Sequence, residues 1–571
     1  MTAATPPGAA SAASPKTAAA VSAPASSAQP TAVGWMDRPR TGRWLALGLG
    51  VIAAVGYSWG IATPWPWNDE GATYLALQRD WAGLAVLWRG PDAPMVPYYY
   101  LAKTWTTLCS FWPGLSTLVA VRLLSASAAT ATVVLLYALV ARNAGRFAGV
   151  LAGVMLLSLT GFDRAAQEAR GYALLALAAT VSWLVSDRRL RPGRLALGFG
   201  SLAPVEGDVG SRRHDGIGPA AGHALSLAAV GTIHTFGVFQ WPAHLIAWLV
   251  APGAPRIRWR RTVSIGLTLG AAGLVAGVQL AMAVRHGTGP QGQGAHQSVT
   301  IAGVADQLLR GIAATPSPLA SVLVLVLALV GMVSRPGGSR EFPVGMLIWL
   351  TVPLAIELAV GVVRTNLFRQ RYWVAFLPPL AALAALGVVA IAALVVRSLR
   401  RTHSPDPGSW SPSSRIVAAV TAAVLFAGQA AMALPAQSRI RMPRGHGQNL
   451  AGVFAAIADA RAEHPGVRVV ISNGSANGMI GSVDPAIMAT NPLSRIDPST
   501  RRVYSTWPSP SFVREALAGD RYLLWIYKGR VTSDDAARHV PAPLAELHPT
   551  ILRVAPAGSG WTVVLMELSG R

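Results

Sequence analysis

Long apolar stretches separated by short charged loops recur along most of the chain. Hydrophobic residues make up 52% of it and charged residues only 13%, too few charges to cover a soluble surface of this size. The apolar stretches lie near 44–62, 117–140, 147–162, 171–186, 224–250, 262–284, 318–334, 342–363, 372–397 and 414–434. If the segment 195–250 holds two spans of ~20 residues, the pattern predicts a polytopic α-helical membrane protein with about eleven transmembrane helices.

The connecting loops alternate in charge. Arginines cluster at 142–146, 188–194, 251–261, 335–341 and 398–413. Positive charge marks cytoplasmic loops, so we expect a multi-pass protein of the inner or plasma membrane, with its N-terminus in the cytoplasm and its C-terminus outside. Because the formal net charge of +23 has this explanation, no nucleic-acid partner is expected.

The N-terminal end differs in composition from the apolar part. Residues 1–42 are expected to be a disordered cytoplasmic tail, since 1–34 are rich in Ala, Ser, Pro and Thr and lack apolar periodicity. A signal peptide is not expected, because no basic stretch followed by an apolar run occurs before Arg43. Residues 43–434 then form the predicted transmembrane domain, whose first extracytoplasmic loop covers 63–116.

The last part of the chain, 435–571, has a different pattern. A predicted amphipathic helix at 448–463 is followed by four short apolar runs that predict strands, at 467–472, 522–527, 551–554 and 561–567. These elements predict a small extracytoplasmic α/β domain. Its sequence contains no motif that assigns it a role.

One segment does not fit the pattern of spans. Residues 201–223 are polar and glycine-rich, in the middle of the expected fifth span. Lipid tolerates such a backbone only where protein or water surrounds it. An insertion and a sequence error both remain open.

Candidate chemistry begins in the first outside loop. Asp69 and Glu70 follow the aromatic run Trp65-Pro66-Trp67 at the end of the first span. Paired carboxylates at a membrane boundary are costly unless they are solvated or used. One of them could accept a proton from a hydroxyl in a group transfer. On these residues alone, a solvated loop with aromatic interface anchors is an open alternative.

Three motifs occur in order: WNDEG at 67–71, VRLLS at 121–125 and QEARGY at 167–172. Together they resemble the N-terminal half of the GT-C glycosyltransferases, and most of all the branch of protein O-mannosyltransferases and lipid A aminoarabinose transferases. The segment RYWVAFLP at 371–378 is similar to a later helix of that family. The resemblance covers about 60–190 and 364–390, and it implies a GT-C fold.

The resemblance also implies roles for individual residues. Asp69 matches the catalytic base of the family and Glu70 its partner, while Glu168 and Arg170 match side chains that face the same cavity. The implied donor is a polyprenyl-phosphate-linked sugar, and the implied outcome is inversion at the anomeric carbon. No nucleotide is needed at this face, which agrees with the lack of a Gly-rich phosphate loop in the sequence.

Further residues are assigned to donor or acceptor binding. Guanidinium groups bind phosphate bidentately, although arginines at the ends of spans also extend to lipid headgroups without any binding role. For His234, a buried polar residue satisfied by its neighbours is the favoured alternative to a binding role. The binding residues predicted on this basis are Asp92, Tyr99, Glu168, Arg170, His234, Arg364, Arg369, Arg371 and Tyr372.

Cofactors are less constrained. Cys109 is the only cysteine, which excludes an intrachain disulfide and a cysteine-based metal site. A divalent metal is possible, but His286 and His296 show no ligand spacing, so no metal ligands are assigned. Their loop, 285–317, could instead cover the cavity as a lid.

The predicted function is therefore a membrane glycosyltransferase. It would move mannose or a similar sugar, with arabinose as the nearest variant, from a polyprenyl phosphate to a hydroxyl of a protein, lipid or polysaccharide outside the cytoplasm. A transporter or flippase is a rival, but such proteins usually show broken helices and polar residues near the midplane. A non-catalytic envelope-assembly protein is the third possibility.

Overall fold

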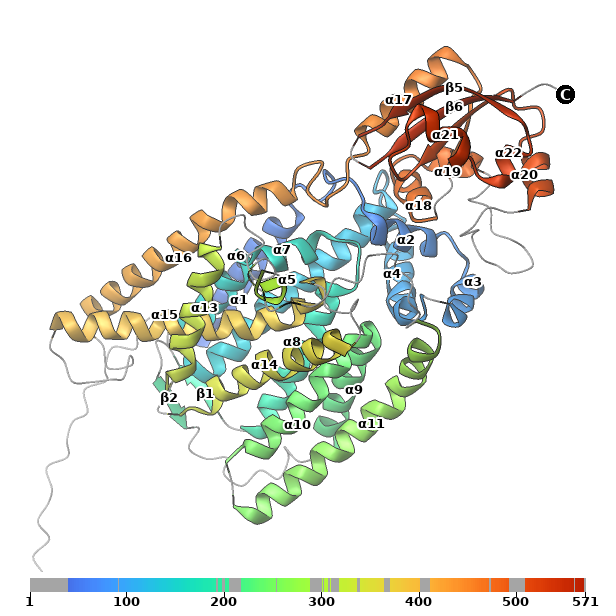
Figure 1. Ribbon diagram of the computed structural model, residues 1–571. Helices are drawn as coiled ribbons and strands as arrows, with labels where there is room; N and C mark the ends of the chain where they lie inside the picture. The colour runs from blue at the N-terminus through green and yellow to red at the C-terminus, as the bar shows by residue number, and fades with distance from the viewer. Residues whose placement is uncertain are drawn as a thin grey trace, which may run out of the picture.

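The protein is described here from a computed structural model. It describes residues 39–90, 92–191, 194–197, 201–204, 217–252, 254–287, 300, 302–306, 309, 318–335, 339–363, 370–400, 411–471, 474–491, 509–558 and 560–568. Most of the tail expected at 1–42 lies outside these residues. Within them, helices form one large body, and a small sheet with its own helices sits at one end of it (Figure 1).

The helical body follows the apolar stretches of the sequence. Its long helices are α1 (Pro39–Ser58), α5 (Thr117–Ala144), α6 (Arg146–Ser158), α8 (Tyr172–Leu190), α9 (Ile217–Ile233), α10 (Gln240–Val250), α11 (Pro255–Gly287), α13 (Leu319–Val333), α14 (Glu341–Val363), α15 (Leu377–Arg400) and α16 (Pro412–Ile440). Further helical elements lie in the connections, namely α2 (Asn68–Leu77), α3 (Trp81–Val86), η2 (Leu87–Arg89), η3 (Ala93–Met95), α4 (Val96–Cys109), α7 (Thr160–Gln167), η5 (Thr235–Phe239) and η7 (Gln370–Phe376).

Fewer helices meet a strict criterion for spanning than the sequence predicts. Among the described residues, five stretches are long and apolar enough to cross a membrane: Thr117–Ala144, Pro255–Met282, Glu341–Gly361, Arg371–Leu399 and Pro412–Ile440. The pair α6 and α7, bent by 68°, makes a sixth if it counts as one span. The predicted number of about eleven is therefore not confirmed.

The irregular segment after α8 explains part of this difference. Strands β1 (Arg194–Leu197) and β2 (Ser201–Pro204) pair antiparallel, and the next helix among the described residues is α9, which starts at Ile217. The described part of 195–250 thus holds two helices of 17 and 11 residues, α9 and α10, and both are shorter than the predicted spans.

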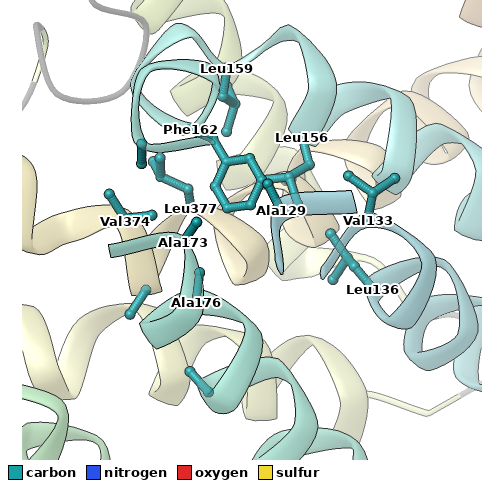
Figure 2. Close-up of a cluster of buried hydrophobic side chains, with 14 of the residues drawn as sticks. Ala129, Val133, Leu136, Leu156, Leu159, Phe162, Ala173, Ala176, Val374 and Leu377 are labelled. Atoms are coloured by element: carbon teal, nitrogen blue, oxygen red, sulfur yellow. The ribbon is translucent and has the colours of Figure 1, made fainter. Parts of the chain in front are cut away.

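The core of the helical body lies where α5, α6, α7, α8 and the start of α15 meet. Phe162 from α7 points into this cluster between Leu156, Ala129 and Ala173 (Figure 2), and all four side chains are buried. Small residues such as these alanines let the helices approach closely, which is how helices pack inside a membrane. This core supports the turn that joins α7 to α8.

The C-terminal domain is the predicted α/β unit. Its elements are α17 (Ala451–Glu463), β3 (Arg468–Ile471), α18 (Gly474–Val483), α19 (Pro485–Thr490), α20 (Pro510–Ala516), β4 (Tyr522–Tyr527), α21 (Ser533–His539), α22 (Ala542–Ala545), β5 (Pro549–Pro556) and β6 (Thr562–Leu568). The strands form one sheet in the order β3-β4-β6-β5, with β3 parallel to β4 and the other pairs antiparallel. The helix and all four strands predicted here are confirmed.

Successive side chains of a strand point to opposite faces of the sheet, so the domain has two apolar layers, one on each face. Leu524 and Ile526 of β4 belong to the cluster that also contains residues of α17 and α18. Leu523 and Trp525, on the opposite face of the same strand, belong to the cluster with Val513 of α20 and Leu544 of α22. The sheet is therefore covered by helices on both faces, which is the expected consequence of a strand buried on both sides.

This domain packs directly on the segment between α1 and α5. Helix α18 lies against α2 (Figure 1), and the two helices touch through glycines. A Cβ atom added to Gly71 would lie 2.4 Å from the carbonyl oxygen of Ser475, and one added to Gly478 would lie 2.1 Å from that of Gly71. Only residues without a side chain allow this approach. The contact places the C-terminal domain within one helical turn of Asp69.

Candidate active site

Asp69 lies in the first turn of α2, in the segment that follows α1. Its carboxylate accepts a hydrogen bond from Nη1 of Arg371 at 3.0 Å, and Nη2 of Arg170 lies 3.8 Å away. The side chain of Asp69 remains 23% exposed. Two sequence motifs that lie 302 residues apart, around Asp69 and Arg371, thus meet in one site.

Glu70 is more deeply buried than Asp69 and makes more hydrogen bonds. It is fully buried, and its two oxygens accept hydrogen bonds from Nε and Nη2 of Arg122, both at 2.8 Å. The backbone N–H of Ala169 donates to it at 2.8 Å, and Nδ1 of His446 lies 3.3 Å away. Burial alone would raise the pKa of Glu70, but Arg122 and His446 outweigh burial and hold this pKa well below its usual range.

These contacts define what Glu70 does in the structure. Arg122 also donates to the carbonyl oxygens of Ile61 and Pro64, so one arginine joins α5, α2 and the segment after α1. Glu70, predicted as a catalytic partner, occupies the position of a residue that holds Asp69 in place. Its buried oxygens already have protein partners.

The motif at 167–170 forms the turn between α7 and α8. The Oγ of Ser125 donates to the carbonyl oxygen of Glu168 at 2.7 Å and also contacts that of Arg170 at 3.1 Å. The carboxylate of Glu168 accepts from Nε of Arg164 at 2.7 Å. Glu168 therefore pairs with its own helix, whereas Arg170 turns towards Asp69.

Arg170 also interacts with other polar side chains near Asp69. Its Nη1 contacts the hydroxyl of Tyr99 at 3.4 Å and Oγ1 of Thr73 at 3.3 Å. Burial raises the pKa of Tyr99, and the nearby Asp92 raises it further. Burial also raises the pKa of Asp92, while Arg170 opposes that change. Asp92, Tyr99, Arg170 and Asp69 thus form one connected group of interacting polar side chains.

Aromatic rings line the side of this group nearest to Arg371. The guanidinium carbon of Arg371 lies 5.4 Å from the ring of Trp67 and 5.5 Å from that of Tyr372, within the range of cation–π attraction. His234 is 5.3 Å from Tyr372 between ring centroids. Burial, with Arg170 and Arg371 nearby, lowers the pKa of His234 to about 3, so this ring is neutral at pH 7.

The structure brings most of the predicted residues together. Asp69, Asp92, Tyr99, Arg170, His234, Arg371 and Tyr372 belong to one region. Arg364 and Arg369 lie outside the described residues, as does His296. Sequence reasoning did not single out His446, 376 residues from its partner Glu70, because no local pattern marks a contact made across the fold.

Comparison with solved structures gives a match over nearly the whole chain. ArnT from Cupriavidus metallidurans, in its crystal structure bound to undecaprenyl phosphate, matches with a TM-score of 0.51 at 14% identity, over 94% of this chain and 99% of that chain. Its apo form matches with a TM-score of 0.52 at 13% identity, over 92% and 98% of the two chains. The chain has the GT-C fold.

The GT-C fold is what this likeness establishes, since the identities are low. The oligosaccharyltransferase AglB from Archaeoglobus fulgidus matches with a TM-score of 0.45 at 13% identity, over 85% of this chain and 69% of that chain. No protein-family model matches the sequence, and no curated protein matches it either.

Two further observations delimit the site of this GT-C protein. Among the residues that the structure describes, no three His, Cys, Asp or Glu side chains are grouped so as to hold a metal ion. A cavity of about 460 Å³ is lined by Asp187, Arg191 and Glu341 among others. It lies near the far end of α8, a helix about 28 Å long at 1.5 Å per residue, and so belongs to a different region from Asp69.

Proposed function

We propose that the protein is a membrane glycosyltransferase that uses a polyprenyl-phosphate-linked sugar. The observation that carries this proposal is a partly exposed carboxylate, Asp69, held beside Arg371 and Arg170 at the end of the membrane helices. A base next to cations is the arrangement that a transfer from a phosphate leaving group requires.

In the proposed reaction, Asp69 accepts the proton of the acceptor hydroxyl. The hydroxyl oxygen forms a bond to the anomeric carbon of the sugar as the bond from that carbon to the phosphate oxygen breaks. Attack opposite the leaving group inverts the anomeric centre. The lipid phosphate leaves with the bonding electron pair, and Arg371 and Arg170 stabilise its charge by charge-assisted hydrogen bonds.

The comparison with ArnT supports the choice of donor. That protein shares the fold over most of both chains and binds undecaprenyl phosphate in its crystal structure. By the resemblance of its motifs, the sugar proposed for this chain is mannose or a related sugar, with arabinose as the nearest variant, and the acceptor is a hydroxyl of a protein, lipid or polysaccharide. The alternation of basic loops supports an outward-facing site, with the C-terminal domain outside.

A genetic experiment tests this proposal and identifies the donor. Lipid-linked sugars and envelope glycans are compared between a strain lacking the gene and the same strain restored with either the native gene or Asp69→Asn. The proposal requires one lipid-phosphate sugar to accumulate in the first strain and in the Asp69→Asn strain. Normal pools in the Asp69→Asn strain, with normal protein levels, would count against it.

A further inference from the structure

Lys528 of the C-terminal domain reaches the active-site helix. It follows the last residue of β4, and its Nζ donates a hydrogen bond to Oδ1 of Asn68. Asn68 is the first residue of α2 and the neighbour of Asp69. A residue 460 positions away in the sequence therefore contacts the turn that carries the proposed base.

The lysine is held in this position by its own domain. The ammonium nitrogen lies 5.6 Å from the centroid of the Trp561 ring. The hydroxyl of Thr562 donates to the carbonyl oxygen of Gly529 at 2.8 Å and accepts from the N–H of Val531 at 3.1 Å, which fixes the backbone just after Lys528. A long side chain fixed in this way loses less entropy when it binds than a freely rotating surface lysine.

Charge links Lys528 to Asp69 itself. Burial lowers the pKa of Lys528, and the carboxylate of Asp69 opposes this change. The glycine contact between Gly71 and Gly478 holds the domain in register with α2. The ammonium group is thus a third cation near Asp69, besides those of Arg371 and Arg170.

Three successive residues of α2 are each held by a cation from a different part of the chain. Asn68 is bonded by Lys528 of the C-terminal domain, Asp69 by Arg371 of η7, and Glu70 by Arg122 of α5. Such an arrangement fixes the direction of the Asp69 side chain, because the residues before and after it are both held by hydrogen bonds. Catalytic side chains need this kind of support from the residues around them.

We propose that the C-terminal domain forms the outward side of the active site and that Lys528 is a positioning residue for Asp69. This rests on the proposed function. Arg371 and Arg170 approach Asp69 from the helical body, where the phosphate of a membrane-embedded donor arrives. Lys528 approaches from the C-terminal domain, so the acceptor hydroxyl enters from the side of the site that this domain forms.

The test uses the full-length protein in membranes from a strain lacking the gene, which contain the natural donor and acceptor. The rate at which labelled lipid-linked sugar is consumed is measured for Lys528→Met, Lys528→Arg and Arg530→Met, the last being a nearby exposed cation. Binding of undecaprenyl phosphate and the thermal midpoint are measured on the same variants after purification.

Lys528→Met is expected to slow transfer by about tenfold or more, because a displacement of ~1 Å at a reacting group can cost about a hundredfold. Lys528→Arg, which can also donate to Asn68, restores the rate to within about threefold, and Arg530→Met behaves as the native protein. Undecaprenyl phosphate binding and the thermal midpoint stay unchanged in all three, since Lys528 is placed away from the donor phosphate.

A normal transfer rate in Lys528→Met would overturn the proposal. So would a loss of thermal stability in Lys528→Met that Lys528→Arg fails to restore, because the lysine would then be a structural contact only. Asp69→Asn in the same assay separates this inference from the proposed function. A normal transfer rate in Asp69→Asn would contradict the proposed function. A normal transfer rate in Lys528→Met alone would contradict only the role of the lysine.

Discussion

Asp69 and Arg371 hold each other in the structure, and the proposed reaction gives each of them a substrate partner as well. The 3.0 Å contact is made to Oδ2 of Asp69, and Nη2 of Arg170 lies 3.8 Å from the same oxygen. A donor phosphate offers Arg371 a second anionic partner, and its two oxygens suit the guanidinium fork. On this account donor binding draws Arg371 from Asp69 and leaves the carboxylate ready for the acceptor.

Replacing Arg371 by Ala therefore affects the donor more than the acceptor. Loss of a charge-assisted bond to phosphate costs about 1.5–3 kcal/mol, or roughly ten- to a hundredfold in affinity. The measurement is the affinity of purified protein for undecaprenyl phosphate. Arg397→Ala, at an exposed arginine of α15, the helix that follows η7, is the control and keeps native affinity. An unchanged affinity in Arg371→Ala would remove Arg371 from the donor site.

Helix α2 depends on the buried ion pair between Glu70 and Arg122. This pair connects α2 with α5. The N–H of Ala169 also donates to Glu70 and so connects α2 with the turn before α8. Removing one partner of such a pair leaves the other charge buried and unpaired, which usually costs about 3–5 kcal/mol. The short helix that carries Asp69 thus gains its fixed position from contacts with other elements rather than from its own length.

Glu70→Gln is expected to destabilise the protein by about 3 kcal/mol at pH 7. The folded-state pKa of Glu70 lies below its ordinary value of 4.5, so the ion pair stabilises the fold above pH 4.5 and its contribution is lost as the pH falls below that value. The difference in the free energy of unfolding between the native protein and the variant should therefore be smaller at pH 4 than at pH 7, as measured by thermal unfolding. Glu515→Gln, at an exposed position, serves as the control. A constant difference at both pH values would contradict this role for Glu70.

Elements with a strong local pattern were predictable from the sequence. The strands of the C-terminal sheet and long helices such as α5 and α16 follow from apolar runs of the right length and period. The interrupted region 195–250 was not predictable, because its polar residues give no local signal for a pair of short strands followed by two short helices. The difference in the strict count of spans comes in part from this region and in part from other helices, such as α8 and α13, that do not meet the criterion of length and hydropathy.

The site was predictable only in part. Asp69, Arg170 and Arg371 were found because each belongs to a motif that resembles a known family. His446 and Lys528 belong to no motif, and they reach α2 only through the packing of the C-terminal domain. The glycines at 71 and 478 permit that packing, yet a single glycine in a sequence says nothing about its distant partner.

The molecule as a whole joins a helical membrane body to a small α/β domain at one end (Figure 1). Helix α16 leads into that domain, and Arg441 just beyond it pairs with Asp163 at 2.6 Å and 2.8 Å. The site at Asp69 lies where the two parts meet. In the proposed reaction this end of the molecule faces away from the cytoplasm.

Reporter fusions test this orientation. A fusion at position 440 should be active for an enzyme that works only after export and inactive for a cytoplasmic reporter, because the basic loops are expected to remain inside. A fusion in the basic segment 398–413 is the matched control and should give the opposite result. A reporter at 440 that is active only in the cytoplasm would contradict the proposed mechanism.

The central claim is that the carboxylate of Asp69 accepts the proton of the acceptor. Its most direct test is the rate of sugar transfer by purified Asp69→Asn, with lipid-linked sugar isolated from a strain lacking the gene as donor and membranes of that strain as acceptor. Asparagine keeps the shape of the side chain but cannot take the proton, so transfer should fall by at least about a hundredfold in a protein that still folds. A purified Asp69→Asn protein that transfers sugar at nearly the native rate would contradict the claim.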